Sequence, residues 1–256
     1  MEIEDLVKKI QELVNHRRSG FTREEDRELS QITKFRDSFR YKHGAVYFHF
    51  ELIKTSKKKV EEEIERAHKN KELLTSEKNL RKSLRLNEEV KFKSTILLED
   101  IIYHLTSLID NLPKIIGVYF KTVRPELGFR TAKKQLNQNH TKNLDITKLI
   151  NKNWDEWIEK LKEFRASIFH HHSKTVQGIL TVRVGKNIEG NQQFKEEILI
   201  NIPKELRELF KYGEGNVEIE QFCNDIMGKS YEFFNDLFDL LIIEHKKYVQ
   251  ELKEIK

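Results

Sequence analysis

The chain has 256 residues, of which 38% are hydrophobic and 35% are charged, and its formal net charge is +5 at pH 7. With only 10 glycines and 3 prolines, the composition favours long helices and argues against a many-stranded β architecture. The length allows one elaborated domain or two smaller ones. The positive charge permits a polyanionic partner without requiring one, because 47 basic residues stand against 42 acidic residues.

A single cysteine, Cys223, excludes an intrachain disulfide and any zinc site built from several cysteines. The N-terminal stretch MEIEDLVKKIQELV is acidic and amphipathic, and it lacks the basic start and the apolar run of a secretory signal. No uninterrupted apolar run approaches the roughly 20 residues that a membrane helix needs. We therefore expect a soluble, cytoplasmic protein with no membrane-spanning segment.

The first third of the chain predicts three helices. Apolar residues spaced three and four apart give a short first helix, and Thr22 and Glu25 then have the spacing of a capping box. The helix that follows keeps apolar steps to Ile64, with Gly44 as the candidate for a break. A highly charged segment, residues 72–90, follows as an amphipathic outer helix. We expect residues 1–90 to be a helical extension that packs on a bundle.

The remainder, residues 91–256, predicts a helical domain with one inserted β-hairpin. Residues 94–111 form the most apolar helix of the first half, and Pro113 starts or kinks a further turn. Another helix is predicted over residues 147–172, and a last one runs from about residue 216 to the C-terminus. Alternating apolar residues on both sides of a turn-rich stretch predict a hairpin at about residues 177–202. The fold class is therefore all-α with one inserted hairpin.

Residues 122–147 are the least regular part of the sequence and are rich in basic residues. Arg124, Arg130, Lys133 and Lys134 lie here with few acids nearby. Two interpretations remain open, a mobile basic loop that follows a nucleic-acid backbone and a plain surface connection. On the first interpretation, these four side chains are the RNA-binding residues.

The segment KLKEFRASIFHHHS places Arg165 before three successive histidines, His170, His171 and His172. The guanidinium keeps its charge and its planar fork suits a phosphate, whereas imidazole gains and loses a proton near neutral pH. A neutral imidazole can take a proton from a ribose 2′-hydroxyl, and an imidazolium can give one to the leaving 5′-oxygen. On a regular helix, Arg165 lies about 20° from His172 in projection and about 140° from His170. A second copy across a two-fold axis is the simplest way to complete a site.

These residues resemble the signature of the HEPN superfamily (higher eukaryotes and prokaryotes nucleotide-binding). The resemblance rests on Arg165 and His170 with four residues between them, on the text WIEKLKEFRASIFHHHS, and on the earlier helix DIIYHLTSLIDNL. The text around the motif looks like a bacterial stand-alone branch in which further histidines follow the first. The resemblance covers roughly residues 94–173 and the C-terminal helix, and leaves the N-terminal third unmatched.

The resemblance implies a HEPN-like helical bundle that dimerises and brings two motifs together. Many members of the superfamily are metal-independent endoribonucleases in toxin–antitoxin or phage-defence systems, and others only bind nucleotides or RNA. Carried over by position, Arg165 would bind the scissile phosphate and His170 would be the general acid or base, with His171 and His172 able to substitute or assist. The sequence departs from the pattern at Ala166, where Asn or Asp is usual, and Ser167 is a displaced stand-in.

Several functions therefore stay open. The first is a homodimeric endoribonuclease that cleaves RNA by 2′-hydroxyl attack on the phosphate, with an antitoxin protein as a further partner. The second is a non-catalytic module that binds RNA, nucleotides or proteins, and the third is a structural dimerisation protein. The histidines also have a purely structural interpretation, as caps of a helix C-terminus. We expect no metal and no cofactor, because adjacent helical residues point about 100° apart and consecutive histidines do not converge on one ion.

Overall fold

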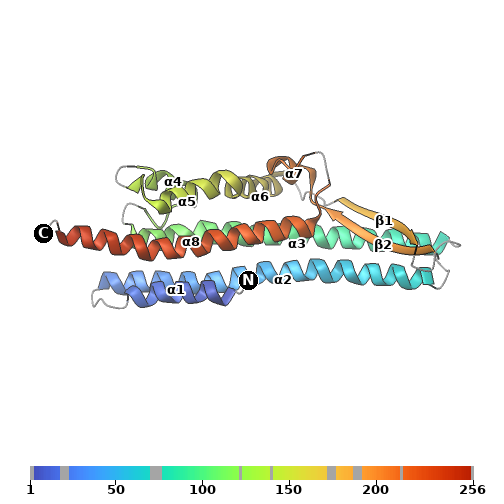
Figure 1. Ribbon diagram of the computed structural model, residues 1–256, viewed down its shortest axis with the longest axis horizontal. Helices are drawn as coiled ribbons and strands as arrows, with labels where there is room; N and C mark the ends of the chain where they lie inside the picture. Colours follow the sequence, from blue (N-terminus) through green and yellow to red (C-terminus); the bar gives the residue numbers. More distant parts are fainter. Residues whose placement is uncertain are drawn as a thin grey trace. The chain divides into compact units, whose positions relative to one another are not determined.

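Long helices dominate the computed structural model, which describes residues 3–17, 23–69, 77–120, 123–138, 141–171, 177–186, 192–213 and 216–254 (Figure 1). The long helices are α1 (Ile3–Arg17), α2 (Arg23–Lys69), α3 (Glu77–Tyr119) and α8 (Ile219–Glu254). The shorter ones are α4 (Phe129–Leu136), α5 (Asp145–Asn153), the π-helical turn Trp154–Ile158, α6 (Glu159–His171) and α7 (Lys204–Leu209). Strands β1 (Gln177–Lys186) and β2 (Gln192–Asn201) form the hairpin. The predicted all-α class with one inserted hairpin is confirmed.

The chain divides into two compact units. The first unit combines Met1–Val46, Tyr103–Lys162 and Ile226–Lys256, and the second combines Tyr47–Ile102 and Glu163–Asp225. Helices α2, α3, α6 and α8 each contribute a segment to both units. The domain boundary expected at residue 90 falls inside α3 and inside the second unit.

Two interruptions expected in the first half of the chain are absent. Helix α2 runs through Gly44 without a break, and α3 runs through Pro113. The three segments predicted separately between residues 72 and 121 therefore contribute to one helix, Glu77–Tyr119. Leu112 and Ile115, on either side of the proline, are fully buried. Burial of both neighbours stabilises the helix where proline removes a backbone hydrogen bond.

An aromatic cluster forms the centre of the first unit. The ring centroid of Phe39 lies 5.9 Å from that of Phe35, 5.1 Å from Phe234 and 5.7 Å from Phe238. His43, which is 2% exposed, stacks on Phe39 with the ring centroids 5.2 Å apart. Burial lowers the pKa of His43 from 6.5 to about 4, so this imidazole stays neutral at pH 7. The cluster joins the first half of α2 to the middle of α8.

Polar contacts fix α1 on this core. Lys9 Nζ lies 2.6 Å from a carboxylate oxygen of Asp239 on α8. The Tyr119 hydroxyl donates to the carbonyl of Leu13 over 3.2 Å, and Tyr119 itself is buried. A buried phenol needs such an acceptor, because an unsatisfied hydroxyl costs about 1–3 kcal/mol. Helix α1 therefore belongs to the core of the first unit.

The hairpin of the second unit is antiparallel, with Gln177 opposite Asn201 and Lys186 opposite Gln192. Asn201 continues into an isolated bridge with Glu218, and the amide of Ile202 donates to the carbonyl of Val217 over 3.0 Å. These bonds tie the end of β2 to the start of α8. An isolated hairpin is marginal in water, so this attachment gives it a partner in the helical scaffold.

An ion-pair cluster joins α2 to the same junction in the second unit. Lys57, whose side chain is 12% exposed, pairs with Glu218 and lies 3.3 Å from a carboxylate oxygen of Glu220. Burial alone would lower the pKa of Lys57, but the hydrogen bond to Glu218 and the charges of both carboxylates outweigh it and raise the pKa. Lys57 is therefore a charged structural anchor.

Gly117 lies on α3 where the segment that follows the helix, residues 123–125, returns along it. A substitution at Gly117 tests how closely this segment packs on the helix. A Cβ at this position would lie 2.7 Å from the carbonyl oxygen of Val123 and 3.3 Å from Cδ of Pro125. We expect Gly117→Ala to lower the free energy of unfolding by about 1–3 kcal/mol, because the 123–125 segment must move away from the helix. Equilibrium unfolding in urea measures this change.

The matched control is Gly228→Ala in α8, where a Cβ would meet nothing within 4 Å. That substitution should raise the free energy of unfolding by roughly 0.5–1 kcal/mol, because alanine loses less backbone entropy in a helix. Equal effects of the two substitutions would contradict the close approach at Gly117.

Candidate functional site

The arginine of the predicted motif lies on α6, immediately after the buried Phe164. Arg165 is partly exposed and Ala166 is exposed. The Ser167 hydroxyl donates to the carbonyl of Phe164 over 2.7 Å, within its own helix. The Ser167 hydroxyl therefore donates its one proton to the backbone, and the Ala166 side chain has no hydrogen-bond donor. Neither side chain provides the free polar group that the family resemblance places after the arginine.

The histidines occupy the end of the same helix. Helix α6 continues without interruption through His170 to His171. The side chains of His170 and His171, and all of His172, lie outside the described residues. On an ideal α-helix, positions five residues apart, such as 165 and 170, differ by about 140° around the helix axis.

The irregular stretch before α5 contains a helix that was not predicted. Helix α4 buries Phe129, Ala132 and Leu136, and the Thr141 hydroxyl donates to the carbonyl of Leu136 over 2.7 Å. The Thr147 hydroxyl in turn donates to the carbonyl of Thr141 over 2.8 Å. These contacts hold residues 129–138 and 141–147 together in the structure. The described part of the stretch is a packed connection that carries basic side chains.

The four basic residues predicted in this stretch have different surroundings. Lys133 lies 3.2 Å from a carboxylate oxygen of Asp155 and over the ring of Trp154, 5.1 Å from its centroid. Arg124, Arg130 and Lys134 are exposed, and Lys133 is half-buried. Lys133 therefore serves first as a packing residue. The other three are the side chains that a polyanion can reach.

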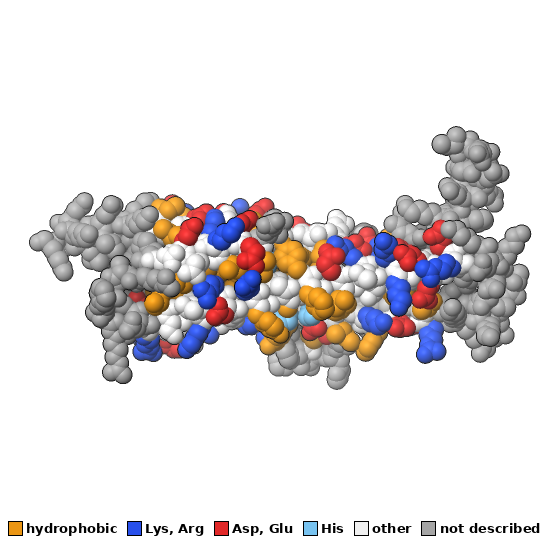
Figure 2. All heavy atoms as spheres, turned by 90° about the horizontal axis from the view of Figure 1, so that it is seen from below, with side chains coloured by type: hydrophobic (Ala, Val, Ile, Leu, Met, Phe, Trp, Pro, Cys, Tyr) orange, Lys and Arg blue, Asp and Glu red, His pale blue; other side chains and the backbone are white. Residues whose placement is uncertain are grey.

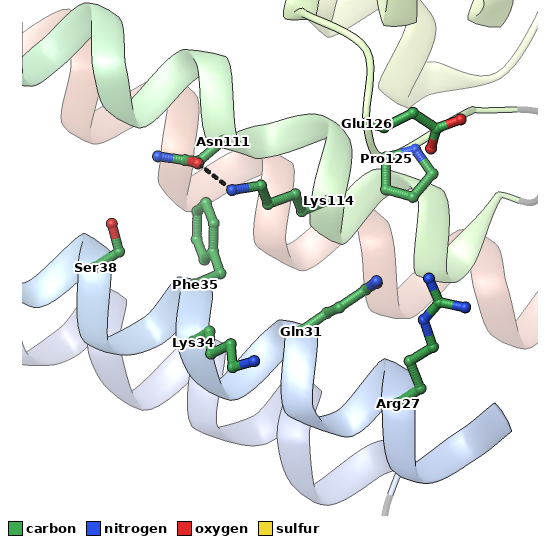
Figure 3. Close-up of a pocket in the computed structure, with 9 residues that line it drawn as sticks. All are labelled: Arg27, Gln31, Lys34, Phe35, Ser38, Asn111, Lys114, Pro125 and Glu126. Atoms are coloured by element: carbon green, nitrogen blue, oxygen red, sulfur yellow. Dashed lines mark hydrogen bonds between the residues drawn. The ribbon is translucent and has the colours of Figure 1, made fainter. Parts of the chain in front are cut away.

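A cavity of about 360 Å³ lies in the first unit (Figure 3). Helix α2 forms one wall, and the end of α3 and the segment that follows α3 form the other. The cavity lining comes from Arg27, Gln31, Lys34, Phe35, Ser38, Asn111, Lys114, Pro125 and Glu126. The lining thus contains three cations and one carboxylate. An adjoining hollow of about 300 Å³ shares Arg27 and Glu126 and adds Arg124 to its wall.

Two features position the polar groups of this cavity. Arg27, Gln31, Lys34 and Ser38 step by four, three and four along α2, so that they project from one face of the helix. On α3, Asn111 donates to the carbonyl of Ser107 over 2.9 Å, and its side-chain oxygen accepts from Lys114 over 2.8 Å. The amide thereby holds the Lys114 ammonium at the cavity wall (Figure 3).

Sequence reasoning missed this cavity because the N-terminal segment was interpreted only as packing. The polar face of α2 was visible as a repeat, since Arg27, Gln31, Lys34 and Ser38 keep helical spacing beside the apolar stripe. The contribution of α3 could not be found in this way. Asn111 and Lys114 are about 80 residues away along the chain, and only the fold brings them to α2.

The remaining surface mixes charged and apolar side chains, as Figure 2 shows for one face. Large apolar side chains are exposed on α2 and α3, among them Tyr41 at 73%, Phe48 at 61% and Phe92 at 67%. Within the described part of the chain, no group of three or more His, Cys, Asp or Glu side chains could hold a metal ion. Among the helices that the structure describes, none contains a segment that is long and apolar enough to cross a membrane.

Comparisons with protein-family models, with curated proteins and with solved structures found no match to this chain.

Proposed function

We propose that this chain is a metal-independent endoribonuclease of the HEPN type that works as a homodimer. The observation that carries the proposal is the continuity of α6 from Arg165 to His171, with the arginine partly exposed. A guanidinium that binds phosphate and an imidazole that moves a proton are the two groups that this reaction needs. The homodimer is part of the proposal, because two copies of α6 would bring Arg165 and His170 of different chains to one phosphate.

The chemistry of the proposed step is a transesterification. Histidine, with His170 as first choice and His171 or His172 as alternatives, takes the proton from the ribose 2′-hydroxyl. The 2′-oxygen then attacks the adjacent phosphorus and the 5′-oxygen leaves, taking a proton from an imidazolium. Arg165 stabilises the charge that builds up on the phosphate oxygens. The products are a 2′,3′-cyclic phosphate end and a 5′-hydroxyl end.

RNA is the proposed substrate, and the exposed cations support this choice. Arg124, Arg130 and Lys134 provide exposed positive groups in the first unit, and phosphate contacts dominate RNA affinity. We place such a nuclease in the cytoplasm, in a toxin–antitoxin or phage-defence system, with an antitoxin protein as its inhibitor. These assignments follow from the resemblance of the motif alone.

A second function is favoured by the absence of a polar residue after the motif arginine. Ala166 offers no hydrogen bond, and Ser167 donates to the carbonyl of Phe164. A module that binds RNA, nucleotides or another protein without cutting needs no such group. This alternative predicts salt-sensitive binding and intact RNA.

The two functions are separated by incubating the purified protein with 5′-labelled RNA in the presence of EDTA. The nuclease is expected to produce fragments that end in a 2′,3′-cyclic phosphate at a rate that the chelator does not change. Intact RNA that still shifts on a native gel at low salt, and less at high salt, would support the binding module instead.

A further inference from the structure

The cavity between α2 and the end of α3 has the features of a small-molecule site. We propose that it binds a small organic phosphate whose body carries hydroxyl groups, such as a sugar phosphate. The inference goes beyond the proposed nuclease and uses neither Arg165 nor the histidines. A volume of about 360 Å³ lies at the lower end of the range of about 300–1,000 Å³ that is typical of small-molecule sites.

The phosphate is assigned to the end of the cavity at Lys34 and Lys114. Lys34 comes from α2 and Lys114 from α3, so that two lysines from different helices line this end (Figure 3). Asn111 holds Lys114 through a 2.8 Å hydrogen bond, which reduces the side-chain entropy that binding would cost. Within the described residues, no carboxylate forms an ion pair with Lys34 or Lys114. The two charges are therefore available to a dianion.

The hydroxyl-bearing body is assigned to the other end, at Arg27 and Glu126. Arg27 lies seven residues before Lys34 on α2, which is about 10 Å along the helix axis. Here the guanidinium supplies donors and the Glu126 carboxylate supplies acceptors (Figure 3). Neighbouring hydroxyl groups use both, because each can donate and accept. A second phosphate at this end would be repelled by Glu126.

Apolar surface is supplied at both ends, by Phe35 next to Lys34 and by Pro125 next to Glu126 (Figure 3). Such surface favours the carbon skeleton of an organic ligand over a bare ion. The predicted order of affinity is therefore sugar phosphate above inorganic phosphate. The cavity also disfavours a cationic ligand, since Arg27, Lys34 and Lys114 outnumber its one carboxylate.

The test is isothermal titration calorimetry of the full chain with ribose 5-phosphate and with inorganic phosphate. We expect the double variant Lys34→Met, Lys114→Met to weaken both ligands by about a hundredfold or more, because each of the two lost charge-assisted hydrogen bonds contributes about tenfold or more. Lys152→Met removes an exposed lysine of α5 from outside the cavity and should leave both affinities unchanged. RNA cleavage should be retained by the double variant, so that failure of this site and of the nuclease proposal can be told apart.

Glu126→Gln tests the assignment of the hydroxyl-bearing end. The preference for ribose 5-phosphate over inorganic phosphate should fall about fivefold, because only the sugar uses the carboxylate. An unchanged preference would overturn that assignment. The site would be overturned if neither probe gave heat on titration, or if the Lys152 variant lost as much affinity as the cavity variants. It would also be overturned if the double variant lost RNA binding but kept ribose 5-phosphate binding.

Discussion

Replacing Phe39 by alanine is expected to lower the free energy of unfolding by about 3–5 kcal/mol. The ring is fully buried and lies within 6 Å, between centroids, of Phe35, Phe234 and Phe238. Its loss removes apolar surface from the core and leaves a cavity between α2 and α8 that rigid neighbouring rings fill poorly. Aromatic edge contacts with Phe234 and Phe238 are lost as well. Unfolding in urea, followed by helical circular dichroism, measures the effect.

The same substitution nine residues later is the matched control. Phe48 is also on α2 but is 61% exposed, so Phe48→Ala should change the free energy of unfolding by less than about 0.5 kcal/mol. The pair holds residue type and helix constant and varies burial alone. A large loss at Phe48 would mean that its ring is covered in solution, for instance by a second copy of the chain. A small loss at Phe39 would contradict the aromatic core.

The apolar stripes of the long helices could be predicted because helix periodicity is local information. Ile32, Phe35 and Phe39, which belong to the apolar steps that predicted the second helix, have the spacing of one helix face, and all three are buried. The hairpin was also predicted, since a strand repeats every two residues and a helix does not. Whether a helix continues or breaks at a given residue was harder to predict. Gly44 and Pro113 weaken a helix locally, and only the packing of the surrounding residues decides whether the helix continues.

Helix α4 shows why short elements escape such reasoning. Its buried residues, Phe129, Ala132 and Leu136, do keep helical spacing. Eight residues are too few for a stable isolated helix, so α4 exists because its neighbours bury it. The same holds for function. Lys133 was assigned to RNA, but its partner Asp155 is 22 residues away along the chain and could not be foreseen.

The motif on α6 was found from sequence because both of its residue types lie within one short segment. Arg165 and His170 are five residues apart, and the helix that carries them was predicted from Trp157, Leu161 and Phe164, all of which are buried. What surrounds the motif is a non-local property. Ser167, considered as a stand-in for the usual polar residue, bonds to the Phe164 carbonyl. Its role in catalysis is therefore expected to be small.

Arg165→Ala and His170→Ala are each expected to reduce RNA cleavage by about 100-fold or more while leaving the helical circular dichroism unchanged. The first removes the group that binds the phosphate, and the second removes the proton-transfer group. Arg165→Lys should recover only part of the loss, because an ammonium keeps the charge without the planar fork. Ser167→Ala should cleave like the parent chain, because the Ser167 hydroxyl already donates to a backbone carbonyl. Full activity in the Arg165 and His170 variants would exclude the nuclease proposal.

Mixing the two inactive variants tests the shared site directly. If Arg165 of one chain works with His170 of its partner, a mixed dimer has one site with both groups intact and one site with neither. Random pairing makes half of the dimers mixed, so the mixture should recover about a quarter of the parent activity by symmetry alone. Sites contained within a single chain would give no recovery at all. On an ideal helix, positions 165 and 170 differ by about 140°, which favours recovery, because a site shared by two chains does not need both groups on one face of a single helix.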